Sequence, residues 1–172
     1  LGKVNEMNRH PKYDMRTLET RPDGAQLKAS HLSFMDPEIV YSLCMLRQDV
    51  FILEQQVTSE QELDGLDRED STITLWWEKD GDVIGTIRVF PGDGCMRIGR
   101  LACAKSARRG GFGGALMAAA IDLCKEREST QKIVIHGQSY LKGWYESLGY
   151  VTVSDEFEEA GIAHYTMEYR HP

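Results

Sequence analysis

The chain has 172 residues and carries 20 Lys and Arg against 27 Asp and Glu, a net charge of −7 at neutral pH. This length suits one compact domain, and the acidic balance disfavours a nucleic-acid or anionic-membrane partner. The longest unbroken apolar run, 115–121, is far shorter than the roughly 20 residues that a membrane crossing needs.

The first segment of the chain, residues 1–26, is polar and rich in charge. It shows no sustained hydrophobic period, so we expect a mobile or loosely packed lead-in, followed by one domain over 27–172. A weak alternation of apolar residues at 27–34 predicts the first strand of that domain.

A helix is predicted next. Asp36-Pro37 is typical of a helix start, because Asp caps helix N-termini and Pro suits the first helical position. Apolar residues then recur at helical spacing from Ile39 to Phe51. The following stretch, 60–70, holds six acidic residues against one Arg. Its composition favours a solvated loop, and the alternative is a negative wall that attracts a cationic substrate.

From residue 72 onward, β-branched and aromatic residues occur in short alternating runs. Tight glycine-containing turns separate the first three runs, which predicts an antiparallel meander over 72–79, 83–90 and 95–104. The remaining pattern predicts, in order, a helix at 113–127, a strand at 132–137, a helix at 139–148, and strands at 150–154 and 164–169. The sequence therefore predicts a mixed α/β sheet in a single domain.

The cysteines indicate neither a metal site nor a disulfide framework. None has a second Cys or a His at ligand spacing, so we expect reduced, mostly buried thiols in a cytoplasmic protein that holds no metal. A disulfide between two of them stays open. The four residues are Cys44, Cys95, Cys103 and Cys124.

The most informative stretch is a glycine-rich turn between a predicted strand and the strongest predicted helix. It reads Arg108-Arg109-Gly110-Gly111-Phe112-Gly113-Gly114. Glycines let the backbone turn tightly and present several N–H groups in one direction, and the start of the helix adds a partial positive charge. With two arginines at its mouth, the turn predicts a site for a phosphate or diphosphate group.

Two common phosphate-binding motifs fit this turn poorly. The dinucleotide fingerprint G-x-G-x-x-G needs a glycine where Leu116 stands, and it normally follows the first strand of a βαβ unit. The P-loop motif has Ala104 in place of its second glycine, just before Lys105-Ser106. A plain glycine-rich turn without a ligand remains open on these observations.

A third motif fits without a mismatch. Arg108, Gly111 and Gly113 match the pattern R-x-x-G-x-G. Together with the preceding strand, 98–103, they resemble the acetyl-CoA motif of the GNAT superfamily of N-acetyltransferases.

A second stretch, 138–150, resembles another GNAT motif, in which Tyr145 and the closing Gly149-Tyr150 match. Three of its positions hold a residue other than the usual one: Gln138, Leu141 and Trp144. Four further stretches are similar to the ElaA-type branch of the superfamily, at 47–55, 62–67, 137–138 and 158–164. In the last of these, Ala163 stands where that branch often has Pro.

The resemblance implies a GNAT fold, with a mixed and mostly antiparallel central sheet flanked by helices. It implies direct transfer of an acetyl group from acetyl-CoA to a primary amine of a small molecule, within a ternary complex. The glycine-rich turn would hold the diphosphate, and Gln138 together with strand backbone would hold the pantetheine arm. The implied backbone positions are Leu101, Ala102 and Cys103.

The resemblance also implies a general acid, Tyr145. A phenol is protonated at neutral pH and can donate its proton to the leaving thiolate. The general base stays open among Glu54, Glu62, Asp64, His136 and His164, of which we carry Glu54 and His164 into the catalytic assignment.

Other readings of the whole chain remain. In the context of an acetyltransferase, the acidic stretch 60–70 favours a cationic acceptor. The alternative from another class is a catalytically silent acetyl-CoA sensor, and a P-loop nucleotide hydrolase is more distant. We expect no nucleic-acid or membrane partner, and a homodimer stays open.

Overall fold

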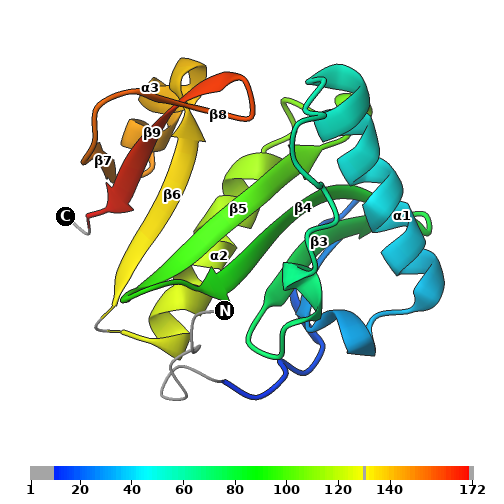
Figure 1. The fold of residues 1–172 in the computed structure, drawn as a ribbon. Coiled ribbons are helices and arrows are strands. Elements are labelled where there is room, and N and C mark those ends of the chain that lie inside the picture. Colours follow the sequence, from blue (N-terminus) through cyan, green and yellow to red (C-terminus); the bar gives the residue numbers. More distant parts are fainter. Residues whose placement is uncertain (1–9, 130, 171–172) are drawn as a thin grey trace.

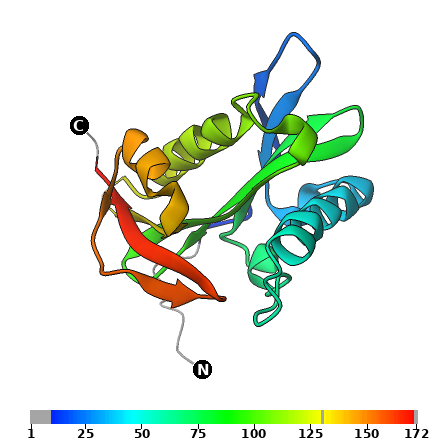
Figure 2. The same cartoon turned by 90° about the horizontal axis from the view of Figure 1, so that it is seen from above.

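The computed structural model describes residues 10–129 and 131–170, which form one nine-stranded sheet with helices on both faces (Figures 1 and 2). The strands are β1 (Arg16–Thr20), β2 (Gln26–Ser30), β3 (Ile73–Lys79), β4 (Asp82–Pro91), β5 (Cys95–Cys103), β6 (Lys132–Gln138), β7 (Tyr150–Thr152), β8 (Phe157–Glu159) and β9 (Ile162–Tyr169). The helices are α1 (Pro37–Arg47), the π-helix η3 (Gln48–Glu54) that continues it, α2 (Phe112–Arg127) and α3 (Lys142–Ser147).

The strands lie in the order β1-β2-β3-β4-β5-β6-β9-β7, and β8 pairs with β9. Within the described ranges, β5 and β6 form the one parallel pair, and every other pair is antiparallel. This confirms the mixed and mostly antiparallel sheet that the sequence predicts.

Two strands, β1 and β8, were not predicted from the sequence, and β2 begins one residue earlier than predicted. β1 and the start of β2 lie inside the segment 1–26 that we expected to be a lead-in. All five residues of β1 are exposed, so this edge strand carries no hydrophobic alternation and is held by backbone pairing to β2. The lead-in is thus corrected for residues 16–20 and 26, while residues 1–9 lie outside the described ranges.

Some boundaries also differ. The strand predicted at 27–34 ends at Ser30 and is followed by a 3₁₀ turn, Leu32–Phe34. The helix predicted at 139–148 divides into a 3₁₀ turn, Ser139–Leu141, and the short helix α3. The spacing of apolar residues does not distinguish a 3₁₀ turn or a π-helix from an α-helix. The sequence therefore did not reveal the two 3₁₀ turns or the π-helix η3.

A hydrophobic core lies on each face of the sheet. In β3 the side chains of Leu75 and Trp77 pack in the core under α2, whereas Trp76 packs in the core under α1 with Leu43 and Leu46. Figure 2 shows α1 and α2 on opposite sides of the sheet. Alternation along one strand therefore supplies both cores, because successive side chains point to opposite faces.

The sheet opens between β5 and β6. These strands pair only through Cys95–Arg97 and Lys132–Val134, and beyond this short contact they diverge toward the top of Figure 1. β5 also holds an extra residue against β4, because Thr86 faces Ala102 while Arg88 faces Gly99. This bulge, where Arg100 adopts a φ of 56°, turns β5 at the point where its open edge begins.

Candidate active site

A cavity of about 1120 Å³ lies where β5 and β6 diverge. Its walls come from β4, β5, β6, the π-helix η3, the start of α2, and the segments around α3 and β8. It gathers every site residue predicted from the sequence except Gly110. These are Glu54, Leu101, Ala102, Cys103, Arg108, Arg109, Gly111, Phe112, Gly113, Gly114, Gln138, Tyr145 and His164.

The glycine-rich turn ends in the N-cap of α2. Gly111 is the N-cap residue and has a φ of 77°, which glycine adopts without strain. The N–H groups of Phe112, Gly113 and Gly114 belong to the first helical turn, so they have no partner within α2. A Cβ added at Gly114 would meet nothing within 4 Å, so this helix start is open to a ligand. The geometry therefore fits a diphosphate group.

The open edge of β5 offers backbone groups to the same cavity. Ala104 N–H donates to the carbonyl of Ile84 at 2.9 Å, on the β4 side. Successive residues of a strand direct their backbone groups to opposite sides, so Cys103 directs its N–H and carbonyl toward the opening. The Cys103 carbonyl accepts a hydrogen bond from Arg108 Nε at 3.2 Å, which leaves its N–H facing the cavity.

Arg108 and Glu54 tie the glycine-rich turn to the π-helix. The guanidinium donates two hydrogen bonds of 2.7 Å to the Glu54 carboxylate, one to each oxygen. These hydrogen bonds lower the pKa of Glu54 below its ordinary value. Arg108 is therefore an anchor of the turn rather than a free cation, and Glu54 is a weakened proton acceptor. Arg109 is exposed as well and also lines the cavity.

Tyr145 reaches the cavity from α3. Its ring packs against the backbone of Gly137 in β6, where an added Cβ would approach the ring carbon Cε2 to 2.8 Å. Its edge also meets the rings of Trp144 and Tyr150. Burial raises the pKa of Tyr145 to about 12, so the phenol is protonated throughout the physiological range.

Two histidines share one carboxylate on the β6–β9 side of the cavity. His136 Nδ1 lies 3.0 Å from Glu159 Oε1, and His164 Nε2 lies 3.8 Å from Glu159 Oε2. His164 Nδ1 lies 2.7 Å from the carbonyl of Ile162, which can only accept, so Nδ1 carries the proton. The hydrogen bond with His136 lowers the pKa of Glu159, which is therefore ionised at neutral pH. In its neutral form, His136 therefore also carries its proton on Nδ1, which leaves Nε2 of either neutral ring without a proton.

The π-helix and β6 meet across the cavity. Gln138 Nε2 donates to Gln55 Oε1 at 3.1 Å, just after the π-helix ends. π-helical turns are rare and often occur at functional sites, and here the turn brings Phe51, Glu54 and Gln55 to one wall. The sequence reasoning identified Gln138 and Glu54, but it did not pair Gln138 with Gln55 or Glu159 with the two histidines. The pairing of Glu159 in β8 carries no local signal, because its histidine partners lie on other strands.

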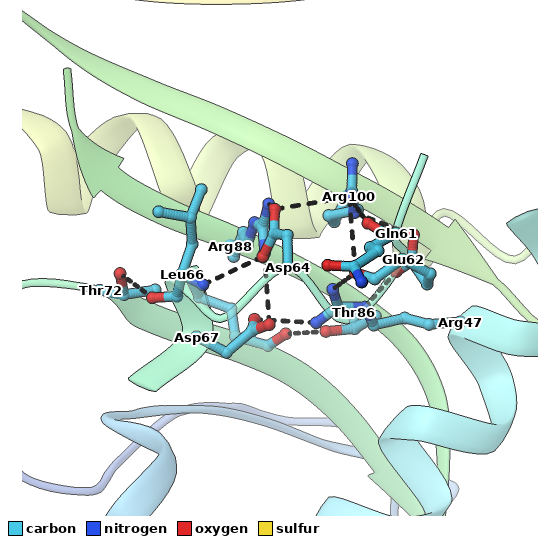
Figure 3. Close-up of polar contacts among 11 residues, drawn as sticks. Arg47, Gln61, Glu62, Asp64, Leu66, Asp67, Thr72, Thr86, Arg88 and Arg100 are labelled. Atoms are coloured by element: carbon cyan, nitrogen blue, oxygen red, sulfur yellow. Dashed lines mark hydrogen bonds and ion pairs between the residues drawn. The ribbon is translucent and has the colours of Figure 1, made fainter. Parts of the chain in front are cut away.

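Part of the acidic stretch folds back onto the sheet, where three of its carboxylates pair with arginines (Figure 3). Asp67 Oδ1 accepts from Arg47 at 2.8 Å and its Oδ2 accepts from Arg88 at 3.2 Å, and all three side chains are buried. Asp64 accepts two hydrogen bonds from Arg88, at 2.6 and 2.9 Å. These contacts hold the stretch against α1 and β4.

Two more contacts complete this network. Arg100 Nε lies 2.9 Å from Glu62 Oε2, and Glu62 Oε1 also pairs with Arg47. Burial raises the pKa of Asp64, but the hydrogen bonds from Arg88 and from the Leu66 N–H outweigh burial and lower this pKa to about 2. Three carboxylates thus face three guanidiniums. The negative wall, which was the alternative interpretation of 60–70, is therefore neutralised at Glu62 and Asp64, and neither carboxylate is free to act as a base.

Two further absences concern the described residues alone. Residues 10–129 and 131–170 hold no group of three His, Cys, Asp or Glu side chains placed to bind a metal ion. No helix in these ranges is long and apolar enough to cross a membrane.

Comparison with known proteins gives consistent matches. Residues 43–171 match the family described as "Acetyltransferase (GNAT) domain". A UPF0039 protein of Mycobacterium tuberculosis is 35% identical over 138 residues, which cover 77% of this chain and 85% of that protein. Protein ElaA of Escherichia coli is 28% identical over 141 residues, which cover 80% of this chain and 91% of ElaA.

A solved structure agrees with these matches. The crystal structure of an acyl-CoA N-acyltransferase from Pseudomonas aeruginosa superposes with a TM-score of 0.79 at 27% identity. The superposition covers 86% of this chain and 100% of that one.

Proposed function

Because the chain belongs to the acetyltransferase (GNAT) domain family and to its ElaA-type branch, we propose that it transfers an acetyl group from acetyl-CoA to a primary amine. The observation that carries this proposal is a single cavity that joins an open helix start, the open edge of β5 and a protonated phenol. These are the parts that such a transfer needs: an anion site, a backbone edge for the pantetheine arm, and a proton donor.

We assign the cosubstrate to the residues as follows. The N–H groups at the start of α2 and the exposed Arg109 hold the diphosphate, and Gln138 faces the arm. Acetyl-CoA supplies an activated thioester carbonyl. The Cys103 N–H donates a hydrogen bond to the carbonyl oxygen as negative charge develops on it, while burial raises the pKa of the Cys103 thiol and keeps it protonated.

One proton transfer is assigned to each side of the cavity, to a base on the β6–β9 side and from Tyr145 on the α3 side. The amine nitrogen bonds to the carbonyl carbon and loses a proton to Nε2 of a histidine in the Glu159 cluster, either His164 or His136. The carbon–sulfur bond then breaks, and Tyr145 donates its phenolic proton to the departing sulfur. Glu54 serves as the partner of Arg108 in this scheme, because its paired carboxylate is a poor base.

The acceptor is proposed to be a small primary amine. The charge that would attract it is Glu159, since Glu62, Asp64 and Asp67 of the acidic stretch are already paired with arginines. One ionised carboxylate beside two histidines suits a singly charged ammonium that must lose a proton before it reacts. A strongly polycationic acceptor is not required by this arrangement.

A ligand comparison followed by an acceptor screen tests the proposal. Acetyl-CoA at about a hundredfold excess over its Kd should stabilise the chain by about 2.7 kcal/mol, whereas ATP with Mg²⁺ should not. Release of free thiol is then followed over a panel of amines. Stabilisation by acetyl-CoA without turnover of any amine would favour a sensor, and absence of stabilisation would refute the proposal.

A further inference from the structure

The turn that is proposed to hold the diphosphate makes contacts to a part of the chain outside the matched family segment. Residues 43–171 match the family, whereas the hairpin of β1 and β2 precedes them. Arg21, the residue that follows β1, extends from this hairpin to the glycine-rich turn. Its Nη1 donates to the carbonyl of Gly110 at 2.8 Å and its Nη2 donates to that of Gly111 at 3.5 Å.

The guanidinium of Arg21 is held in place from several sides. Its central carbon lies 4.5 Å from the ring centroid of Trp77 and 4.3 Å from that of Phe112. Its Nε pairs with Glu19 at 3.3 Å. Trp77 is fully buried, and its Nε1 donates to the carbonyl of Phe112 at 3.2 Å. Arg21 and Trp77 together therefore bond three consecutive carbonyls, from Gly110 to Phe112.

Holding these carbonyls has a consequence for the opposite side of the peptides. A trans peptide unit is planar, and its carbonyl and N–H point in opposite directions. With the Gly110 carbonyl held by Arg21, the N–H of Gly111 points away from the hairpin. Gly111 lines the cavity and Gly110 does not, which agrees with this orientation. Because Gly110 and Gly111 lack side chains, this peptide would rotate easily without a bond to its carbonyl.

We propose that Arg21 is a positioning residue, which sets the turn in the conformation that binds the diphosphate of coenzyme A. This inference rests on the proposed function. Arg21 acts through the peptide between Gly110 and Gly111 and needs no contact with the ligand. The N-terminal hairpin is then part of the cosubstrate site, although it lies outside the matched segment.

The test compares coenzyme A with pantetheine, which keeps the arm but lacks the diphosphate. Affinities of both are measured by calorimetry for the wild type, Arg21→Ala and Arg21→Lys. We expect Arg21→Ala to weaken coenzyme A binding about tenfold, as for loss of one charge-assisted hydrogen bond, and to leave pantetheine binding unchanged. Arg21→Lys keeps a cationic donor and should restore part of the affinity.

Arg16→Ala is the matched control. Arg16 lies on the same hairpin but pairs with Glu126 at 3.0 Å and not with the turn, so both affinities should stay at the wild-type values. Thermal denaturation shows whether each variant is folded. If Arg21→Ala is unfolded, the affinities of Arg21→Lys are compared with those of the wild type instead.

Two outcomes would overturn the inference while leaving the proposed function intact. These are wild-type affinity for coenzyme A in folded Arg21→Ala, or in Arg21→Lys where Arg21→Ala does not fold, and equal weakening of coenzyme A and pantetheine. Failure of the wild type to bind coenzyme A would instead refute the proposed function together with the inference.

Discussion

Tyr145 combines two properties that a proton donor to sulfur requires. It lines the cavity, and burial raises its pKa to about 12, so its proton is not lost to water at working pH. Its position depends on a neighbour without a side chain, since the ring lies directly on Gly137. At the scale of single residues, both the donor and its support can be tested.

Replacing Tyr145 with Phe should lower kcat about 100-fold, because the departing thiolate loses its proton donor. The KM for acetyl-CoA should stay near the wild-type value, since the anion site is unchanged. Because the pKa is raised, the wild-type phenol keeps its proton until the pH nears 12, so the rate should not fall at pH 9 to 10 through this group. Steady-state thiol release across pH measures both effects, and an unchanged kcat in the variant would remove Tyr145 from the mechanism.

Gly137→Ala should reduce activity by moving the phenol rather than by removing it. The added Cβ would stand 2.8 Å from the Tyr145 ring, so the ring must shift, and we expect a destabilisation of about 1–3 kcal/mol. Gly143→Ala in α3 is the control, because a Cβ there meets nothing within 4 Å. Urea unfolding and kcat are measured for both, and wild-type kcat in Gly137→Ala would contradict the packing argument.

Among the elements, the acidic stretch has a structural role that its composition conceals. Asp67 connects Arg47 of α1 with Arg88 of β4, and Glu62 connects Arg47 with Arg100 of β5. The stretch therefore fastens a helix to two strands and forms one wall of the cavity. Three of its six carboxylates, those of Glu62, Asp64 and Asp67, are paired with guanidiniums in this role.

Asp67→Asn should destabilise the fold by about 3 kcal/mol, because it leaves two buried guanidiniums facing an uncharged amide. Asp70→Asn is the control, since Asp70 is exposed and surface substitutions usually change stability by less than about 0.5 kcal/mol. Urea unfolding of both variants at neutral pH gives the comparison. Equal stability of the two variants would show that the network contributes little.

For the whole molecule, the sequence predicted the architecture, and every predicted site residue except Gly110 lines the cavity. The strands of the meander are recognisable because β-branched, aliphatic and aromatic residues concentrate in strands that are largely buried, and the glycine-rich turn is local in sequence. β1 and β8 escaped prediction, since short exposed edge strands have no hydrophobic pattern. Three sets of contacts were also missed, because the residues that form them lie far apart in the chain. They are the ion pairs of the acidic stretch, the contacts of Glu159 with two histidines, and the hydrogen bonds of Arg21 to the glycine-rich turn.

The short contact between β5 and β6 leaves the sheet nearly divided into two parts, joined by three residue pairs. An extended ligand arm that pairs with the free backbone of β5 would fill the missing strand position between them. Binding of coenzyme A should therefore slow amide hydrogen exchange on both sides of the gap, at Cys103 in β5 and around Gly137 in β6. Exchange measured by mass spectrometry with and without coenzyme A checks this, and α1, none of whose residues lines the cavity, should not change.

If exchange slows on both sides of the gap, bound coenzyme A also holds the two parts of the sheet together. The enzyme would be most rigid when loaded and would loosen as the spent thiol departs, so that release of product and relaxation of the scaffold are one event.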